Sequence, residues 1–307
     1  MAALTPQRAV RPGARFLDPA VLARIDNLEL LARTVVDGFL AGLHRSPYLG
    51  FSLDFAEHRQ YMPGDDIRRI DWRLFARTDR HYIKLFEAET NANFVVLLDV
   101  SRSMDYTSHA VTKLDYARYL TAALCFFSRR QRDRVGLVTF DDAIVDYVPP
   151  SMKHMDTVLH VLDGIEAGRA GSLAEPLLQI TELTGRKGIV VVVSDFYADT
   201  DTVFRSVALL KARGHDVIVF HVLDPAELAF PFQDASGFED METGEQIPVI
   251  PERLRDEYLR LLRTHTTELE ERFAGSRIDY RLLDTSQPLD LALFAYLAAR
   301  QRLSRTR

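Results

Sequence analysis

The segment Phe94-Val-Val-Leu-Leu-Asp-Val-Ser-Arg-Ser103 decides the fold of this chain. Five apolar residues precede Asp99, and a short continuous apolar run that ends in polar residues is typical of a strand buried on both faces. A second run, residues 189–193, is followed by Ser194 and Asp195. Strands of this kind form parallel sheets that helices cover on both sides, so the two runs predict an α/β domain.

Apolar runs and amphipathic stretches alternate along the chain after Asn93, which predicts a doubly wound, mostly parallel sheet in a three-layer, Rossmann-type arrangement. One further strand follows its neighbour across Asp141-Asp142, as in a hairpin, and is therefore expected to be an antiparallel edge strand. The predicted strands are residues 94–98, 135–140, 144–148, 189–193, 217–223 and 278–283, and the predicted helices are residues 113–130, 152–165, 173–183, 202–213, 251–273 and 288–302.

The part of the chain before Asn93 has a different pattern. Asp18 and Pro19 suit the start of a helix, and apolar residues recur at three- and four-residue steps as far as Phe39. Short alternating segments follow, separated by turn residues, which indicates a small β-rich region. We therefore expect an N-terminal tail and helix in residues 1–46, the β-rich region in 47–92, and the α/β domain in 93–307 with an acidic hairpin insert at about 228–250.

The composition narrows the class of protein. The 307 residues include 38 Lys and Arg against 44 Asp and Glu, a net charge of −6, and Cys125 is the single cysteine. These values predict a cytoplasmic protein that neither binds nucleic acid nor inserts into a membrane, since no apolar run approaches the roughly 20 residues of a membrane span. The basic C-terminus with Arg300, Arg302, Arg305 and Arg307 is interpreted as a solvated tail.

Oxygen-bearing side chains gather where the two apolar runs end. Asp99, Ser101 and Ser103 occupy alternate positions after the first run, and Asp195 follows the second. Ligands of open α/β sheets bind at the carboxyl ends of the strands, and hard oxygen ligands are those that Mg²⁺ or Mn²⁺ selects. A metal site is the prediction; the alternative is a polar turn in which these side chains cap backbone amides.

These residues resemble the metal-ion-dependent adhesion site of von Willebrand factor A domains. In that family an Asp-x-Ser-x-Ser loop, a Thr from a second loop and an Asp from a third surround a divalent cation, which keeps a coordination position for an acidic residue of the partner. The resemblance implies that Asp99, Ser101, Ser103 and Asp195 hold Mg²⁺ or Mn²⁺, directly or through water. Gly171 stands at the position of the Thr, and Ser172 is a further candidate ligand or the N-cap of the next helix.

A second resemblance covers most of the chain. The segment from Tyr61 to Thr78, residues 84–89, the Glu242-Thr-Gly-Glu245 turn and the terminal Leu293 to Arg300 are similar to the bacterial family called domain of unknown function 58. Members of that family commonly occur beside MoxR-type AAA+ ATPases. The resemblance implies a metal-dependent adaptor or chaperone-like partner of such an ATPase, acting with a client protein and without catalysis of its own.

Charges of both signs surround the single tryptophan in the first of these segments. Arginine binds carboxylates with two hydrogen bonds, and a tryptophan face attracts a guanidinium group. The cluster is interpreted as a structural ion-pair network or as a direct binding surface for a partner. Its members are Asp65, Asp66, Arg68, Asp71, Trp72 and Arg77.

Two other functions stay open. A Mg²⁺-dependent phosphohydrolase of the haloacid dehalogenase type also places an aspartate after the first strand, here Asp99, but needs a second aspartate two residues later as general acid, where this chain has Ser101. The other alternative is a degenerate scaffold that keeps the fold without a metal. Glycine-rich phosphate loops and the Gly-x-Ser-x-Gly elbow are absent from the sequence.

Overall fold

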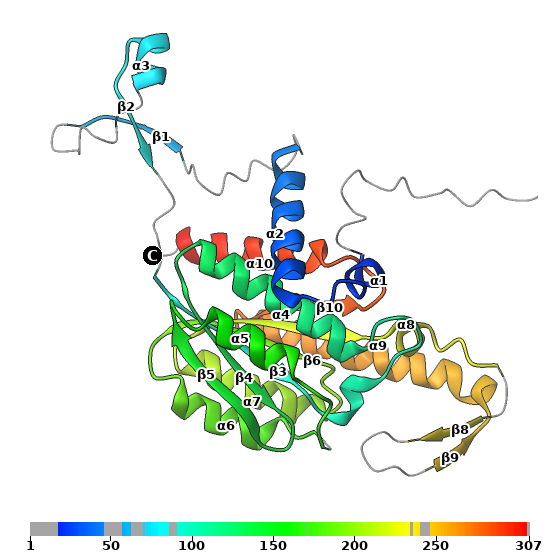
Figure 1. Ribbon diagram of the computed structural model, residues 1–307. Coiled ribbons are helices and arrows are strands. Elements are labelled where there is room, and N and C mark those ends of the chain that lie inside the picture. The colour runs from blue at the N-terminus through cyan, green and yellow to red at the C-terminus, as the bar shows by residue number, and fades with distance from the viewer. Residues whose placement is uncertain are drawn as a thin grey trace, which may run out of the picture. The chain divides into compact units, whose positions relative to one another are not determined.

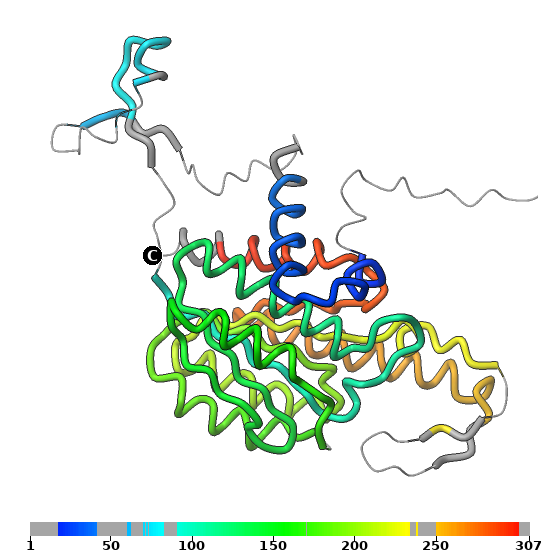
Figure 2. The backbone as a smooth tube through the Cα atoms, viewed as in Figure 1, coloured from blue at the N-terminus to red at the C-terminus, as the bar shows by residue number. Residues whose placement is uncertain are grey.

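The computed structural model describes residues 18–45, 57–62, 70, 72–85, 91–169, 171–233, 236–239 and 246–305. The chain divides into two compact units. The larger comprises residues 1–39 and 91–307, and the smaller comprises residues 40–90. Figure 1 shows the helices and strands of both units, and Figure 2 traces their backbone.

A six-stranded sheet forms the centre of the larger unit, and it confirms the predicted α/β class. Neighbouring strands are parallel except for the pair β4 and β5, so the predicted antiparallel edge strand is also confirmed. In sheet order the strands are β10 (Asp279–Asp284), β7 (Asp216–Leu223), β6 (Gly188–Ser194), β3 (Asn93–Asp99), β4 (Arg134–Phe140) and β5 (Ile144–Ser151). The central strands β3 and β6 are almost wholly buried, which explains their continuous apolar sequences.

Helices cover both faces of the sheet and make it the middle of three layers (Figure 1). The side chain of Thr112 caps the first turn of α4 by accepting a hydrogen bond from the backbone N–H of Asp115. The helices on one face are α4 (Lys113–Arg130), α5 (Met155–Asp163) and α10 (Asp290–Arg305), and those on the other are α6 (Ala174–Leu183), α7 (Thr200–Ala212) and α9 (Pro251–Gly275).

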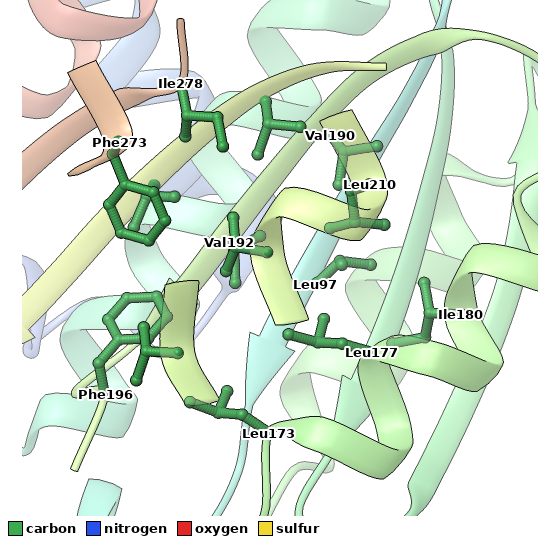
Figure 3. Packing of buried hydrophobic residues seen from close by; sticks show 14 of the residues in the cluster. Leu97, Leu173, Leu177, Ile180, Val190, Val192, Phe196, Leu210, Phe273 and Ile278 are labelled. Atoms are coloured by element: carbon green, nitrogen blue, oxygen red, sulfur yellow. The ribbon is translucent and has the colours of Figure 1, made fainter. Parts of the chain in front are cut away.

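The core on the second face joins the sheet to these three helices (Figure 3). Leu97 and Val192 from neighbouring strands meet Leu177 of α6, Leu210 of α7 and Phe273 of α9, and all five are fully buried. Complete burial of such a side chain contributes about 1.5–3 kcal/mol. This core fixes the strands whose carboxyl ends carry the predicted metal ligands.

The N-terminal helix differs from the expectation of one helix from Pro19 to Phe39. The chain forms α1 (Pro19–Leu22) and then α2 (Leu28–Arg45). Asn27 starts the second helix, because its side-chain oxygen accepts a hydrogen bond from the N–H of Leu30. Buried leucines stand on both sides of the break, Leu22 in α1 and Leu28 at the start of α2, so the apolar period continues through it.

The smaller unit contains an antiparallel pair, β1 (Glu57–Gln60) and β2 (Tyr82–Leu85), with helix α3 (Trp72–Thr78) between them in sequence. The β-rich pattern did not predict this helix. Its aromatic residues pack locally: the Phe75 ring stacks on His81 at 4.4 Å, and Trp72 makes edge contacts with both rings. The tryptophan is 59% exposed.

A short hairpin lies between the end of β7 and α9. Strands β8 (Ser236–Glu239) and β9 (Gln246–Val249) pair antiparallel, and helix α8 (Pro225–Ala229) precedes them. Phe238 of the hairpin contacts Phe230 and Phe232, and Phe230 also contacts Tyr258 of α9. The N-terminal part of α9, which leaves the hairpin, extends past the sheet (Figure 2). Among the described residues, none of the helices combines the length and apolarity that crossing a bilayer requires.

Candidate cation site

The register of the sheet brings the two predicted metal-binding loops together. Leu98 of β3 pairs with Val193 of β6 in a parallel ladder, so both strands end at the same edge. Asp99 ends the first strand, Ser194 ends the second, and Asp195 follows it. The hydroxyl of Ser194 donates a hydrogen bond to Oδ2 of Asp99 at 2.5 Å. The ends of the two strands therefore lie side by side and are joined by this hydrogen bond.

The first loop turns its polar side chains inward. Asp99, Ser101 and Ser103 are 5%, 2% and 8% exposed, whereas Arg102 between the serines is exposed. Oδ1 of Asp99 accepts a hydrogen bond from the N–H of Ser101, and the two serine Oγ atoms lie 3.2 Å apart. The hydroxyl of Ser101 makes no capping bond to the short helix that follows it. One oxygen of Asp99 therefore caps a backbone amide, as the polar-turn alternative predicts. The hydroxyl of Ser101 does not.

Two carboxylates share this buried edge. Burial and the nearby charge of Asp195 together raise the pKa of Asp99 to about 7, although hydrogen bonds from Ser101 and Ser194 work in the opposite direction. Asp195 is 3% exposed and lies in an ion pair, whereas Asp99 has no ion pair with a described residue. A carboxylate in this environment is costly to ionise unless a cation comes close.

The loop before α6, the second loop of the candidate site, explains why position 171 is a glycine. A Cβ atom on Gly171 would lie 2.7 Å from Cβ of Ser101 and 3.1 Å from its Oγ. A threonine here would collide with the first loop, because the side chain of Ser101 occupies the space that a side chain at position 171 would need. Ser172 is exposed, and α6 has Leu173 as its N-cap without a side-chain capping bond. The alternative of Ser172 as a helix cap is therefore wrong.

Asp141 holds the second loop in place, a role that the sequence did not indicate beyond its assignment to a turn. Its Oδ2 accepts the N–H of Arg169, its Oδ1 accepts the N–H of Ala143, and its carbonyl accepts the N–H of Ser172. Burial acts to raise the pKa of Asp141, but the backbone N–H donors outweigh it and hold the pKa below its ordinary value. The carboxylate therefore stays ionised as a brace between two loops.

Gly171→Ala should weaken the binding of Mn²⁺ by at least about tenfold, because the added methyl group displaces Ser101. Isothermal titration calorimetry of the two proteins measures this change. Gly185→Ala is the matched control, since a Cβ there meets nothing within 4 Å. Equal Mn²⁺ affinity in Gly171→Ala and wild type would show that Ser101 takes no part in cation binding.

Lys113 and Glu227 lie beside the third loop, which follows β6 and carries Asp195. Neither residue was predicted. The Lys113 Nζ atom donates to Oδ2 of Asp195 at 2.8 Å and to Oε1 of Glu227 at 2.7 Å. Burial alone would lower the pKa of Lys113, but the two carboxylates overcome this and raise it. One signal was available in the sequence: a lysine in the first turn of a helix opposes the helix dipole and so needs acidic partners.

The donor set fits a hard divalent cation. Two ligands at right angles, each about 2.1 Å from Mg²⁺, lie about 3 Å apart, close to the 3.2 Å between the two serine Oγ atoms. The remaining donors are carboxylate oxygens. Within the described ranges, no group of three or more His, Cys, Asp or Glu side chains is placed to bind a metal. Oxygen donors of this kind are those that Mg²⁺ and Mn²⁺ select in proteins.

The charged cluster around the tryptophan is described only in part. Trp72 and Arg77 lie on α3 and are exposed. The structural and partner-binding interpretations both stay open for this cluster. Its other members, Asp65, Asp66, Arg68 and Asp71, lie outside the described residues.

Comparisons with known proteins give relatives of unknown function and neighbours with a similar fold. An uncharacterized protein of Mycobacterium tuberculosis, Rv1480, is 28% identical over 292 residues, which cover 93% of this chain and 91% of the relative. The BatB protein of Bacteroides thetaiotaomicron matches 68% of this chain and 99% of its own with 15% identity and a TM-score of 0.47. The SpRpn10 VWA domain matches 65% and 92% with 12% identity and a TM-score of 0.40.

The model of one protein family matches residues 57–268, which is more than half of the chain. The match includes both described strands of the smaller unit and the loops that carry Asp99, Gly171 and Asp195. The chain belongs to the family described as protein of unknown function DUF58.

Proposed function

We propose that this protein is a non-enzymatic, cation-dependent adaptor that binds another protein at the carboxyl edge of its sheet. Asp99, Ser101 and Ser103 would hold Mg²⁺ or Mn²⁺, Asp195 would contribute directly or through water, and an acidic side chain of the partner would complete the coordination. A bound cation would supply the charge that attracts that side chain. The observation that carries the proposal is a buried carboxylate, Asp99, that accepts hydrogen bonds from Ser101 and Ser194 and lies near the charge of a second carboxylate, Asp195.

The second loop supports an exchangeable coordination position. Gly171 offers no side chain, and its backbone lies against Ser101. Ser172 is exposed, so a cation held by the first loop keeps room on that side for a ligand from another molecule. Ser172 is retained as an auxiliary ligand in this proposal.

The partner and the compartment are part of the same proposal. The resemblance to proteins encoded beside MoxR-type AAA+ ATPases supports such an ATPase as the partner, together with a client protein. A buried single cysteine, Cys125, suits the reducing cytoplasm. Copurification with the neighbouring ATPase in Mg²⁺, and its loss in a chelator, is the expected result; absence of copurification in either condition would reject this partner.

Mg²⁺ should stabilise the folded protein, by about 2.7 kcal/mol at a hundredfold excess over Kd. Thermal unfolding with and without Mg²⁺ measures this shift. Ser101→Ala combined with Ser103→Ala should remove it, because both hydroxyl ligands are lost. Ser286→Ala, an exposed serine after β10 at the same edge of the sheet, is the control. A wild-type melting curve that Mg²⁺ does not move would contradict the proposed cation site.

A phosphohydrolase is the competing function. Asp99 would be its nucleophile, but Ser101 lies where the general acid is needed, and the sequence offers no second aspartate at that position. Hydrolysis of a generic phosphate ester that disappears in Asp99→Asn would favour the enzyme over the adaptor.

A further inference from the structure

Lys113 is an unusual residue for the interior of a protein. Its side chain is 0% exposed, and it occupies the first position of α4, where the helix dipole opposes a positive charge. Its Nζ atom lies 4.8 Å from the centre of the Tyr197 ring and 5.9 Å from that of Tyr106. A buried ammonium group at this position requires strong compensation, which aromatic faces provide only in part.

The compensation comes from two carboxylates in different loops. Asp195 follows β6, and Glu227 lies in α8, which follows β7. Lys113 donates one hydrogen bond to each, at 2.8 and 2.7 Å. The ammonium group therefore occupies Oδ2 of Asp195 and joins this carboxylate to α8.

The contacts continue beyond Glu227. Its second oxygen, Oε2, accepts the N–H of Asp224 at 2.7 Å, which forms the capping box of α8. The carboxylate of Asp224 accepts the N–H and the hydroxyl of Ser108, a residue in the loop between β3 and α4. A continuous polar chain thus joins the loops after β3, β6 and β7 through Lys113.

We propose that Lys113 is a positioning residue and the built-in competitor of the divalent cation for Asp195. This inference rests on the proposed function, since it concerns the regulation of the same site. Lys113 holds Asp195 in place through their ion pair when no divalent cation is bound. Its positive charge also repels an incoming cation, so the site exchanges its cation readily.

Opposite charge changes in this cluster should have opposite effects. Lys113→Met removes the competing positive charge, so Mn²⁺ should bind at least about fivefold more tightly. Glu227→Gln removes a negative charge and leaves Lys113 to Asp195 alone, so Mn²⁺ should bind at least about fivefold more weakly. A purely structural role predicts something different: both variants would disturb the loops and both would weaken binding.

The experiment measures Mn²⁺ binding by electron paramagnetic resonance on the full chain, at low and at high ionic strength. Circular dichroism selects the variants that fold. Lys113→Met leaves two buried carboxylates without their cation and is the variant at risk of unfolding. Glu227→Gln keeps the lysine, and a loss of affinity that shrinks at high ionic strength distinguishes the lost charge from disturbed loops. Lys187→Met, an exposed lysine just before β6 at the opposite edge of the sheet, is the control and should leave the affinity unchanged.

The outcomes separate this inference from the proposed function. Tighter binding in Lys113→Met, or weaker binding in Glu227→Gln that high ionic strength reduces, supports the competition when the control is unchanged. If the wild type binds Mn²⁺, two results overturn the competition and leave the proposed site standing. One is unchanged affinity in folded Glu227→Gln, and the other is unchanged or weaker affinity in folded Lys113→Met. Binding in Lys113→Met but not in wild type supports the competition and rejects the cation-dependent adaptor. Absence of binding in every protein overturns both.

Discussion

Asp99→Asn should make the cation-free protein more stable at about pH 8 and should also abolish its response to Mg²⁺. The pKa of Asp99 is raised to about 7 from an ordinary 3.8, because the carboxyl group is buried beside Asp195. At 1.36 kcal/mol for each unit, an ionised Asp99 costs the folded state up to about 4 kcal/mol. Asparagine keeps a carbonyl oxygen for the N–H of Ser101 and carries no charge.

The sign follows from proton binding. Between pH 3.8 and about 7 the folded state holds a proton on Asp99 that the unfolded state has released, so the contribution of Asp99 to stability is lost as the pH rises through this window. Below pH 3.8 the residue is protonated in both states. Wild type and Asp99→Asn should therefore differ little in this contribution at acidic pH, and their difference should grow towards pH 8.

Urea unfolding at several pH values, with and without Mg²⁺, measures both effects. Mg²⁺ should stabilise the wild type and leave Asp99→Asn unchanged. Asp105→Asn is a suitable control, because Asp105 is an exposed acidic residue in the same loop. An Asp99→Asn protein that is less stable than wild type at pH 8 without Mg²⁺ would show that the carboxylate serves the fold and is not held at a cost for a cation.

Local sequence was sufficient to predict the architecture and half of the site. Buried parallel strands have continuous apolar sequences, so residues 94–98 and 189–193 were recognisable as β3 and β6. Parallel strands end at a common edge, which placed Asp99 and Asp195 near each other once the strands were identified. These inferences needed only the pattern of apolar residues along the sequence and the identity of the residues at the end of each apolar run.

The rest of the site depends on contacts between distant segments. Asp141 braces Arg169 across 28 residues, and Lys113 reaches Asp195 across 82 residues. Aspartates in turns and lysines in helices are common. Neither residue could be distinguished from others of its kind before the positions of the loops were known. The break before α2 escaped prediction for a different reason: the side chain of Asn27 starts a new helix without interrupting the apolar period.

The C-terminal arginines were interpreted as a solvated tail, and for Arg300 that interpretation is wrong. Its guanidinium forms an ion pair with Asp133, which is 0% exposed, and donates a hydrogen bond to the hydroxyl of Tyr296 at 2.8 Å. Asp133 also accepts the N–H of Ala92 at the start of β3. The sequence did not reveal this pair because its members lie 167 residues apart and meet only when α10 packs on the sheet.

Arg300→Met should lower the free energy of unfolding by about 3–5 kcal/mol, the usual effect of removing one member of a buried ion pair. Urea unfolding measures the change, and Arg253→Met, an exposed arginine of α9, is the control. Adding Asp133→Asn should recover part of the lost stability, since the unpaired buried charge of Asp133 is then removed. A loss below about 1 kcal/mol in Arg300→Met would mean that the pair is solvated and contributes as a surface pair does.

The same variant separates stability from cation binding. Asp133 precedes β4, so the pair lies at the amino edge of the sheet, whereas Asp99 and Asp195 lie at the carboxyl edge. Folded Arg300→Met should therefore bind Mn²⁺ with the wild-type Kd although it unfolds far more easily. Asp99→Asn should show the reverse, a more stable protein without a cation. If Arg300→Met weakened Mn²⁺ binding in the folded protein, the two edges would be coupled through the sheet, and loss of binding in any destabilised variant would no longer identify a ligand.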